Sequence, residues 1–197
     1  MPLVLAPFYL LRHGETEANV RQVAAGGGLD TPLTENGIHQ ARTLASLSHI
    51  LEPKPTRIYH SSMSRARDTA ALVNEALGLD MVEKDNLKEH IFGEWENVDW
   101  SIIKTMIDQK KEPPGGETYH EFALRVRDAI NAIISETHEA PPLIVAHGGL
   151  FHAIGRLYGR PHSHVSNCEL HYFEPDHAAK EFPWRVRILH HNPNLWK

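Results

Sequence analysis

The chain has 197 residues, 41% of them hydrophobic and 23% charged, which is typical of one soluble globular domain. Its net charge of -5 argues against nucleic acid as a partner, because proteins that bind a phosphate backbone carry a basic surface. The first residues lack a basic segment, and Pro2 and Pro7 interrupt their apolar stretch, so neither a secretory signal nor a membrane span is predicted.

Strand and helix patterns alternate along the chain. Short apolar runs that stop at glycine or polar residues predict buried strands, and apolar residues at helical spacing predict helices. The predicted elements are a strand at 8–11, a helix at 38–51, a strand at 57–62, a helix at 63–78, a strand at 81–85, helices at 99–111 and 117–138, a strand at 142–149, a helix at 150–159, and strands at 169–175 and 184–191. This alternation predicts an α/β fold with a mostly parallel central sheet flanked by helices, in a single three-layer domain over 1–197.

Three predicted strands end in residues that carry chemistry. Arg12 and His13 follow the first strand, Ser61 ends the second with Arg65 just after it, and His147 ends a later strand. Ligands of α/β sheets bind beyond the carboxyl ends of the strands. We therefore expect these side chains to meet at one rim of the sheet.

The residue types at this rim favour a phosphoryl group as the ligand. The guanidinium of an arginine binds phosphate through two hydrogen bonds, and both Arg12 and Arg65 would face the same point. Gly14 and Gly148 follow the two histidines near predicted helix starts, where backbone N–H groups bind anions. The two positive charges would keep His13 unprotonated, and neutral imidazole is a nucleophile toward phosphorus. The leaving alcohol then needs a separate acid.

Six sequence blocks extend this pattern over nearly the whole chain. In the order in which they occur, they resemble those of the histidine phosphatase superfamily, in its phosphoglycerate mutase-like branch. The blocks are LRHGETEAN (11–19), DTPLTENGIHQA (30–41), HSSMSRARDTA (60–70), LKEHIFGEWEN (87–97), PPGGET (113–118) and VAHGG (145–149).

The resemblance implies a role for each matching residue and a phosphoglycerate mutase-like fold. It implies that His13 becomes a phosphohistidine, that Glu89 protonates the leaving oxygen and then activates water, and that no metal or other cofactor is needed. The phosphate-binding set that it implies is Arg12, Asn19, Arg65, His147 and Gly148.

Simpler interpretations stay open at several positions. Glu94 is a rival for the acid, and Asn19 could simply cap a turn. Four histidines could suggest a metal site, but their spacing fits no known template and no Cys or Glu completes one. They are His162, His164, His171 and His177.

Two segments depart from the family pattern. The stretch 21–30 carries three consecutive glycines and is one residue longer than usual, so we expect a mobile loop with few side-chain contacts and a more open entrance. The segment 100–113 is a shorter cover than that of the mutases in this family. Because a mutase must exclude water, the short cover favours hydrolysis.

Three functions are therefore compared, with a phosphatase acting on a phosphomonoester as the leading one. The alternatives are a cofactor-dependent phosphoglycerate mutase and a non-catalytic phosphate-binding protein of the same fold. We expect a small phosphorylated substrate and no nucleic-acid or membrane partner. A homodimer could form if the strand 169–175 lay at a sheet edge. The single cysteine, Cys168, cannot form an internal disulfide and favours a cytoplasmic location.

Overall fold

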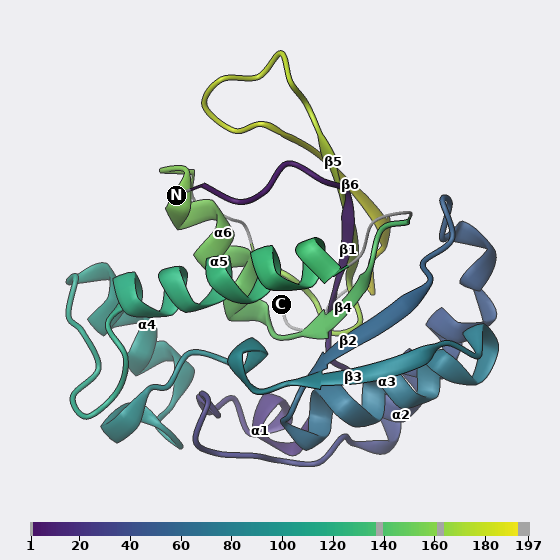
Figure 1. The fold of residues 1–197 in the computed structure, drawn as a ribbon. Helices are drawn as coiled ribbons and strands as arrows, with labels where there is room; N and C mark the ends of the chain where they lie inside the picture. The colour runs from purple at the N-terminus through teal and green to yellow at the C-terminus, as the bar shows by residue number, and fades with distance from the viewer. Residues whose placement is uncertain (1, 137–139, 161–163, 193–197) are drawn as a thin grey trace.

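The structure is a computed structural model, and it describes residues 2–136, 140–160 and 164–192. Strands and helices alternate along most of the chain (Figure 1). The strands are β1 (Phe8–Arg12), β2 (Arg57–Ser61), β3 (Asp80–Lys84), β4 (Leu143–Ala146), β5 (Leu170–Pro175) and β6 (Trp184–His190). The helices are α1 (Glu17–Val20), α2 (Glu35–Ser46), α3 (Ser64–Leu77), α4 (Trp100–Asp108), α5 (Tyr119–Glu136) and α6 (Gly148–Leu157), with short 3-10 turns at Ser48–Ile50, Asp85–Leu87 and Gly93–Trp95.

The six strands form one sheet in the order β3-β2-β4-β1-β5-β6. The first four in this order are parallel, whereas β5 runs antiparallel to both β1 and β6. The prediction of an α/β fold with a mostly parallel sheet is thus confirmed. The suggestion that 169–175 forms an edge was wrong, because β5 is hydrogen-bonded on both sides and β6 is the edge strand.

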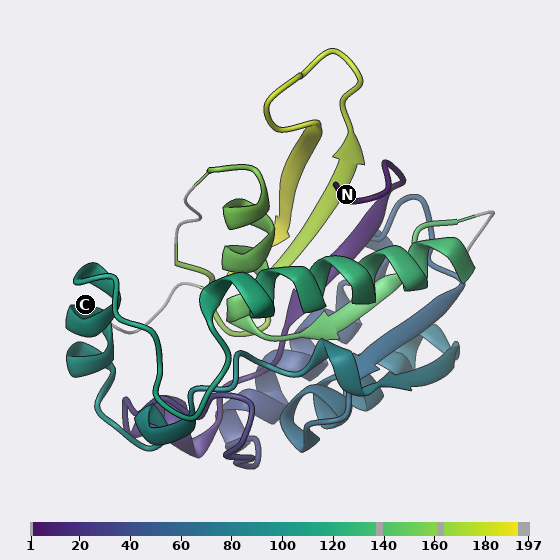
Figure 2. The ribbon, with the colours of Figure 1, turned by 60° about the vertical axis from the view of Figure 1, so that its left-hand side comes forward.

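Alternate side chains of β1 point to opposite faces of the sheet. Phe8 and Leu10 belong to a core with α5 and α6, whereas Tyr9 and Leu11 belong to a core with α2 and α3. All four side chains are fully buried, which explains the continuous apolar run. Helices therefore cover both faces of the sheet (Figures 1 and 2).

Several helix ends differ from the predicted ones. The side chain of Thr34 caps α2 by accepting a hydrogen bond from Gly37 N, so this helix begins at Glu35 rather than at 38 and ends at Ser46 rather than at 51. Gly78 ends α3 as predicted, with a φ of 62° that favours glycine. The end of the predicted helix 117–138 lies outside the described residues.

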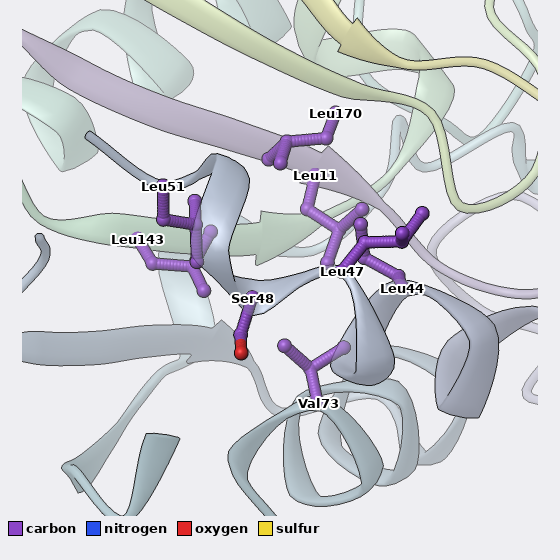
Figure 3. A pocket seen from close by; sticks show the side chains of 8 residues that line it. All are labelled: Leu11, Leu44, Leu47, Ser48, Leu51, Val73, Leu143 and Leu170. Carbon is purple, nitrogen blue, oxygen red and sulfur yellow. The ribbon is translucent and has the colours of Figure 1, made fainter. Parts of the chain in front are cut away.

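A small apolar cavity lies between the sheet and the end of α2 (Figure 3). Its volume is about 10 Å³, and it is lined by leucine and valine side chains and by Ser48. A space of this size holds at most one water molecule, so it is a packing gap in the core. In the part of the chain that the structure describes, no helix is long and apolar enough to cross a membrane.

Candidate active site

The carboxyl ends of three adjacent strands bring the predicted residues together. Arg12 ends β1, Ser61 ends β2, and His147 directly follows β4, which lies between those two strands. His13 N donates a hydrogen bond to Ala146 O at 2.9 Å, so the β1–β4 ladder continues up to the first histidine. The ring centres of His13 and His147 lie 5.2 Å apart.

The imidazole of His13 is held in one orientation. Its Nδ1 lies 2.7 Å from Gly14 O, and because a carbonyl only accepts, Nδ1 carries the hydrogen and Nε2 keeps its lone pair. Burial, followed by the charges of Arg65 and Arg12, holds the pKa of His13 well below its usual value of 6.5. His13 is thus a neutral imidazole with a nucleophilic nitrogen.

Gly14 allows the first strand to meet α2 at close range. A Cβ at this position would lie 2.6 Å from Gly37 O, so a side chain would push the start of α2 away. The N–H of Gly14 donates to Thr69 Oγ1 at 3.0 Å, and that hydroxyl donates to Arg65 O at 2.7 Å. This chain of bonds connects the backbone after His13 to the arginine of α3.

Two arginines lie beside the imidazoles, as predicted. Arg12 donates to Val165 O, and its buried Nε has no hydrogen-bond partner among the described residues. Arg65 is 1% exposed and also contacts Asp30, with 3.3 Å between Nη1 and Oδ1. Burial lowers the pKa of both guanidinium groups, and the carboxylate of Glu89 partly offsets this effect. A pair of cations of this kind, with Arg65 buried and Arg12 half-buried, is suited to a dianion.

His147 caps the start of α6 and is fully buried. Its Nε2 lies 2.9 Å from Ser61 Oγ, which already accepts a hydrogen bond from Met63 N. The Ser61 hydroxyl can therefore donate to Nε2, which leaves Nδ1–H of His147 as a donor, and Nδ1 has no partner among the described residues. Burial, then the charge of Arg65, holds the pKa of His147 well below its usual value.

Glu89 is fixed at the start of α6. Its Oε2 accepts a hydrogen bond from Gly149 N at 3.0 Å, and its Oε1 accepts one from His90 N at 2.9 Å. Its charge also acts on the pKa of both Arg12 and Arg65. The rival carboxylate, Glu94, is exposed and is not among the groups that affect these two arginines. The geometry therefore favours Glu89 as the acid.

The glycine-rich loop is more tightly packed than its sequence suggests. Gly27 N donates to His90 O at 2.8 Å, and Gly28 N donates to Glu96 Oε1 at 2.8 Å. Gly26 O accepts from Arg65 Nη2 at 2.8 Å. A Cβ on any of the three glycines would lie within 2.7 Å of another atom. The expectation of few contacts was wrong, because the glycines permit close backbone packing between Arg65 and the segment that carries Glu89. The more open entrance stays a prediction.

Asn19 acts as a cap, with its Oδ1 fully engaged. This oxygen accepts hydrogen bonds from Thr16 N at 3.1 Å, from Thr16 Oγ1 at 3.0 Å and from Asn167 Nδ2 at 3.1 Å. The bond from Thr16 N, together with the one that Asn19 N donates to Thr16 Oγ1 at 3.3 Å, forms a capping box for α1, a short helix that was not predicted. Only the Nδ2 hydrogens of Asn19 remain for a phosphate. The last residue of the predicted set, Gly148, is the first residue of α6, and a Cβ there would lie 3.4 Å from Arg12 Nε.

The sequence patterns missed a supporting carboxylate behind Arg12. Glu169 O accepts a hydrogen bond from Arg12 N at 3.1 Å. Its buried carboxylate lies 2.6 Å from His171 Nε2 and 2.6 Å from His191 Nδ1. Burial alone would raise the pKa of Glu169, but hydrogen bonds from His171, Ser166 and His191 lower it to about 2. The alternation of Glu169 and His171 within the predicted strand 169–175 was the available signal, although β5 begins only at Leu170.

A histidine metal site does not form among the residues described. No group of three or more His, Cys, Asp or Glu side chains in 2–136, 140–160 and 164–192 is arranged so that it could hold a metal ion. His171 contacts Glu169 instead, and His162 lies outside the described residues.

The sheet and the site together define an α/β protein in which two histidines and two arginines meet at the carboxyl ends of the strands. A family model described as the histidine phosphatase superfamily (branch 1) matches residues 8–183. The chain therefore belongs to this superfamily, which confirms the predicted family.

Named relatives support the same assignment. The chain is 35% identical to the adenosylcobalamin/alpha-ribazole phosphatase of Salmonella typhimurium over 78% of this chain and 80% of that protein. It is 32% identical to a provisionally named phosphoglycerate mutase GpmB of Serratia proteamaculans over 89% of this chain and 86% of that protein. The structure of a mycobacterial glucosyl-3-phosphoglycerate phosphatase aligns with a TM-score of 0.77 at 26% identity, and covers 92% of this chain and 97% of that chain.

Proposed function

We propose that the protein hydrolyses a phosphomonoester through a phosphohistidine on His13. The observation that carries the proposal is the neutral, oriented imidazole of His13 beside the buried Arg65 and the half-buried Arg12. The phosphatases among the named relatives support the same reaction.

In the first step, Nε2 of His13 attacks phosphorus and the bond to the leaving oxygen breaks. Arg12, Arg65 and the Nδ1–H of His147 stabilise the phosphoryl oxygens as charge moves among them. Glu89 gives its proton to the leaving oxygen, so the product leaves as an alcohol.

In the second step, water attacks the phosphohistidine. The carboxylate of Glu89 takes a proton from this water, the P–N bond breaks, and its electron pair returns to His13. Inorganic phosphate leaves, and Glu89 is again protonated for the next turnover. Asn19 and the backbone of Gly148 provide further donors to the phosphate.

Neither step needs a metal or an organic cofactor, because protein groups provide the positive charge and the proton. We further propose a single domain acting in the cytoplasm on a small phosphorylated substrate, without a nucleic-acid or membrane partner. Homodimer formation stays a proposal, and β6 and β3 are the strands whose edges would be available for it.

A phosphoglycerate mutase is the second candidate, favoured by the similarity to GpmB over 86% of that protein. The short cover argues for hydrolysis, since α4 has only nine residues and leaves Trp100 and Ile102 exposed. The two functions separate when phosphate release and isomerisation of 3-phosphoglycerate are measured together, with and without a bisphosphate primer.

The direct test is phosphate release from p-nitrophenyl phosphate in EDTA near pH 6 to 7, with His13→Ala beside the parent. We expect release by the parent alone. Equal inactivity of both proteins on this substrate and on 3-phosphoglycerate would instead indicate a binding protein.

A further inference from the structure

One face of α6 leads from the phosphate site to the protein surface. At about 100° per residue, Gly148 and Gly149 point in directions about 100° apart. A Cβ added to Gly148 would lie nearest to Arg12, and one added to Gly149 nearest to Glu89, so the two glycines face the arginine and the acid. The sector between these two directions therefore looks toward the space between the arginine and the acid, where the leaving oxygen would lie.

Two exposed side chains occupy this sector farther along the helix. His152 lies at about 40° and Arg156 at about 80° from Gly148, about 6 Å and 12 Å along the helix axis. Side chains of a helix slant toward its N-terminus, so both slant back toward the phosphate site. Arg156 is thus an exposed cation at the outer rim of this sector.

Aromatic packing holds the guanidinium of Arg156 at this rim. It lies 5.2 Å from the ring centre of Tyr119 at the start of α5, which packs against α6 (Figure 2). The ring of Tyr119 lies in turn 4.9 Å from that of His90, the residue after Glu89. This stack connects Arg156 to the segment that carries the acid.

The charge of Arg156 is not neutralised by a neighbouring carboxylate. Two other cations of the same region are paired, Lys88 with Asp85 at 2.6 Å and Arg125 with Glu117 at 2.6 Å. In the described ranges, no Asp or Glu lies within ion-pair distance of Arg156. A cation that is oriented by a ring but has no acidic partner is suited to an anionic ligand.

We propose that Arg156 binds a second anionic group on the alcohol part of the substrate. This rests on the proposed phosphatase function and narrows its substrate class to phosphomonoesters with a carboxylate or a further phosphate beyond the scissile one. Arg156 is then a specificity-determining residue, since it contacts neither the transferred phosphoryl group nor the leaving oxygen.

Matched aryl phosphates test this proposal. The two substrates are 4-carboxyphenyl phosphate and its analogue with a neutral substituent, 4-carbamoylphenyl phosphate. The ratio of their kcat/KM values measures how much the substrate carboxylate contributes to recognition. It is measured in the parent, in Arg156→Gln and Arg156→Lys, and in the control Arg160→Gln. Arg160 follows α6, and its guanidinium stacks 4.9 Å from the ring centre of Phe182. The control substitution therefore removes the same charge and the same kind of ring contact as Arg156→Gln. Replacing the carboxylate by a phosphate, in 1,4-phenylene bisphosphate, distinguishes the two anions.

We expect the ratio to fall about tenfold in Arg156→Gln, to fall less in Arg156→Lys, and to stay at the parent value in Arg160→Gln. If the ratio were unchanged in Arg156→Gln for both anions, the proposal for Arg156 would be overturned. Hydrolysis of 4-carbamoylphenyl phosphate in the same experiment would still support the phosphatase function. If the folded parent hydrolysed none of these esters, the phosphatase function itself would be overturned.

Discussion

Glu89 and Gly149 are fitted so closely that a Cβ on residue 149 would lie 1.9 Å from Glu89 Oε1. The same glycine donates its N–H to Glu89 Oε2 at 3.0 Å. The second glycine of the VAHGG block is therefore required by the position of the proposed acid. The first glycine has more space, since a Cβ on Gly148 would lie 3.4 Å from its nearest neighbour, Arg12 Nε.

This difference predicts unequal effects of two neighbouring substitutions. Gly149→Ala must displace Glu89, so we expect kcat for an alkyl phosphate to fall about 100-fold. We expect a much smaller loss for Gly148→Ala, about threefold, because ordinary contact distances are kept there. The values of kcat are measured by steady-state kinetics of both variants, and their melting temperatures show whether they are folded. Equal losses would show that the contact with Glu89 is not the reason for the glycine.

The acid role of Glu89 predicts a dependence on the leaving group. Glu89→Gln cannot donate a proton, so kcat for an alkyl phosphate should fall by about 10² to 10⁴. The loss should be much smaller for p-nitrophenyl phosphate, whose phenolate leaves without protonation. Glu94→Gln is the control, and we expect parent-like rates with both substrates. If Glu94→Gln showed the leaving-group effect instead, Glu94 would be the acid.

The lowered pKa of His13 predicts how the activity depends on pH. The unprotonated ring is the active form, and the fold lowers the pKa of this ring well below 6.5. The nucleophile therefore stays available as the pH falls through 6.5, and protonation occurs only at a lower pH. Removal of a charge in Arg65→Gln should raise the pKa of His13 toward 6.5. Titration of the His13 nitrogen resonances by NMR without phosphate measures both values, and titration near 6.5 in the parent contradicts the account.

Glu169 predicts a stability difference that depends on pH. Its pKa in the folded protein is about 2, below the ordinary 4.5, so folding favours the carboxylate. This contribution, on the order of 3 kcal/mol, is present above about pH 4.5 and is lost as the pH falls toward 2. We expect the free energy of unfolding in urea to be lower for Glu169→Gln than for the parent at pH 7. The difference should shrink as the pH is lowered toward 3, and a constant difference would show that packing, rather than charge, is responsible.

Strand and helix patterns predicted the fold well because the central strands are buried on both faces. The run Phe8–Leu11 is apolar throughout for this reason, and its end at Arg12 pointed to the rim. The order of the motif blocks then gave the family, and all of the blocks except 87–97 lie at the end of a strand or the start of an α-helix. Arg12, His13, Arg65 and His147 could be named before their distances were known.

Other features depend on contacts that local patterns do not contain. The loop with Gly26–Gly28 looked like a flexible segment, yet its glycines are needed because Glu96 and His90 O lie against them. Glu169 supports Arg12 through a strand that returns antiparallel from a distant part of the chain. The unpredicted helix α1 has only four residues, too few for a periodic pattern.

The most direct test of the central claim is a rapid-quench experiment with a ³²P-labelled phosphomonoester. If His13 is the nucleophile, the parent should trap the label as an acid-labile, base-stable phosphohistidine at His13. The rate constant for its formation should be at least as large as kcat. His13→Ala should trap none. Turnover by the parent without such an intermediate, or label at another residue, would contradict the assignment of His13 as the nucleophile.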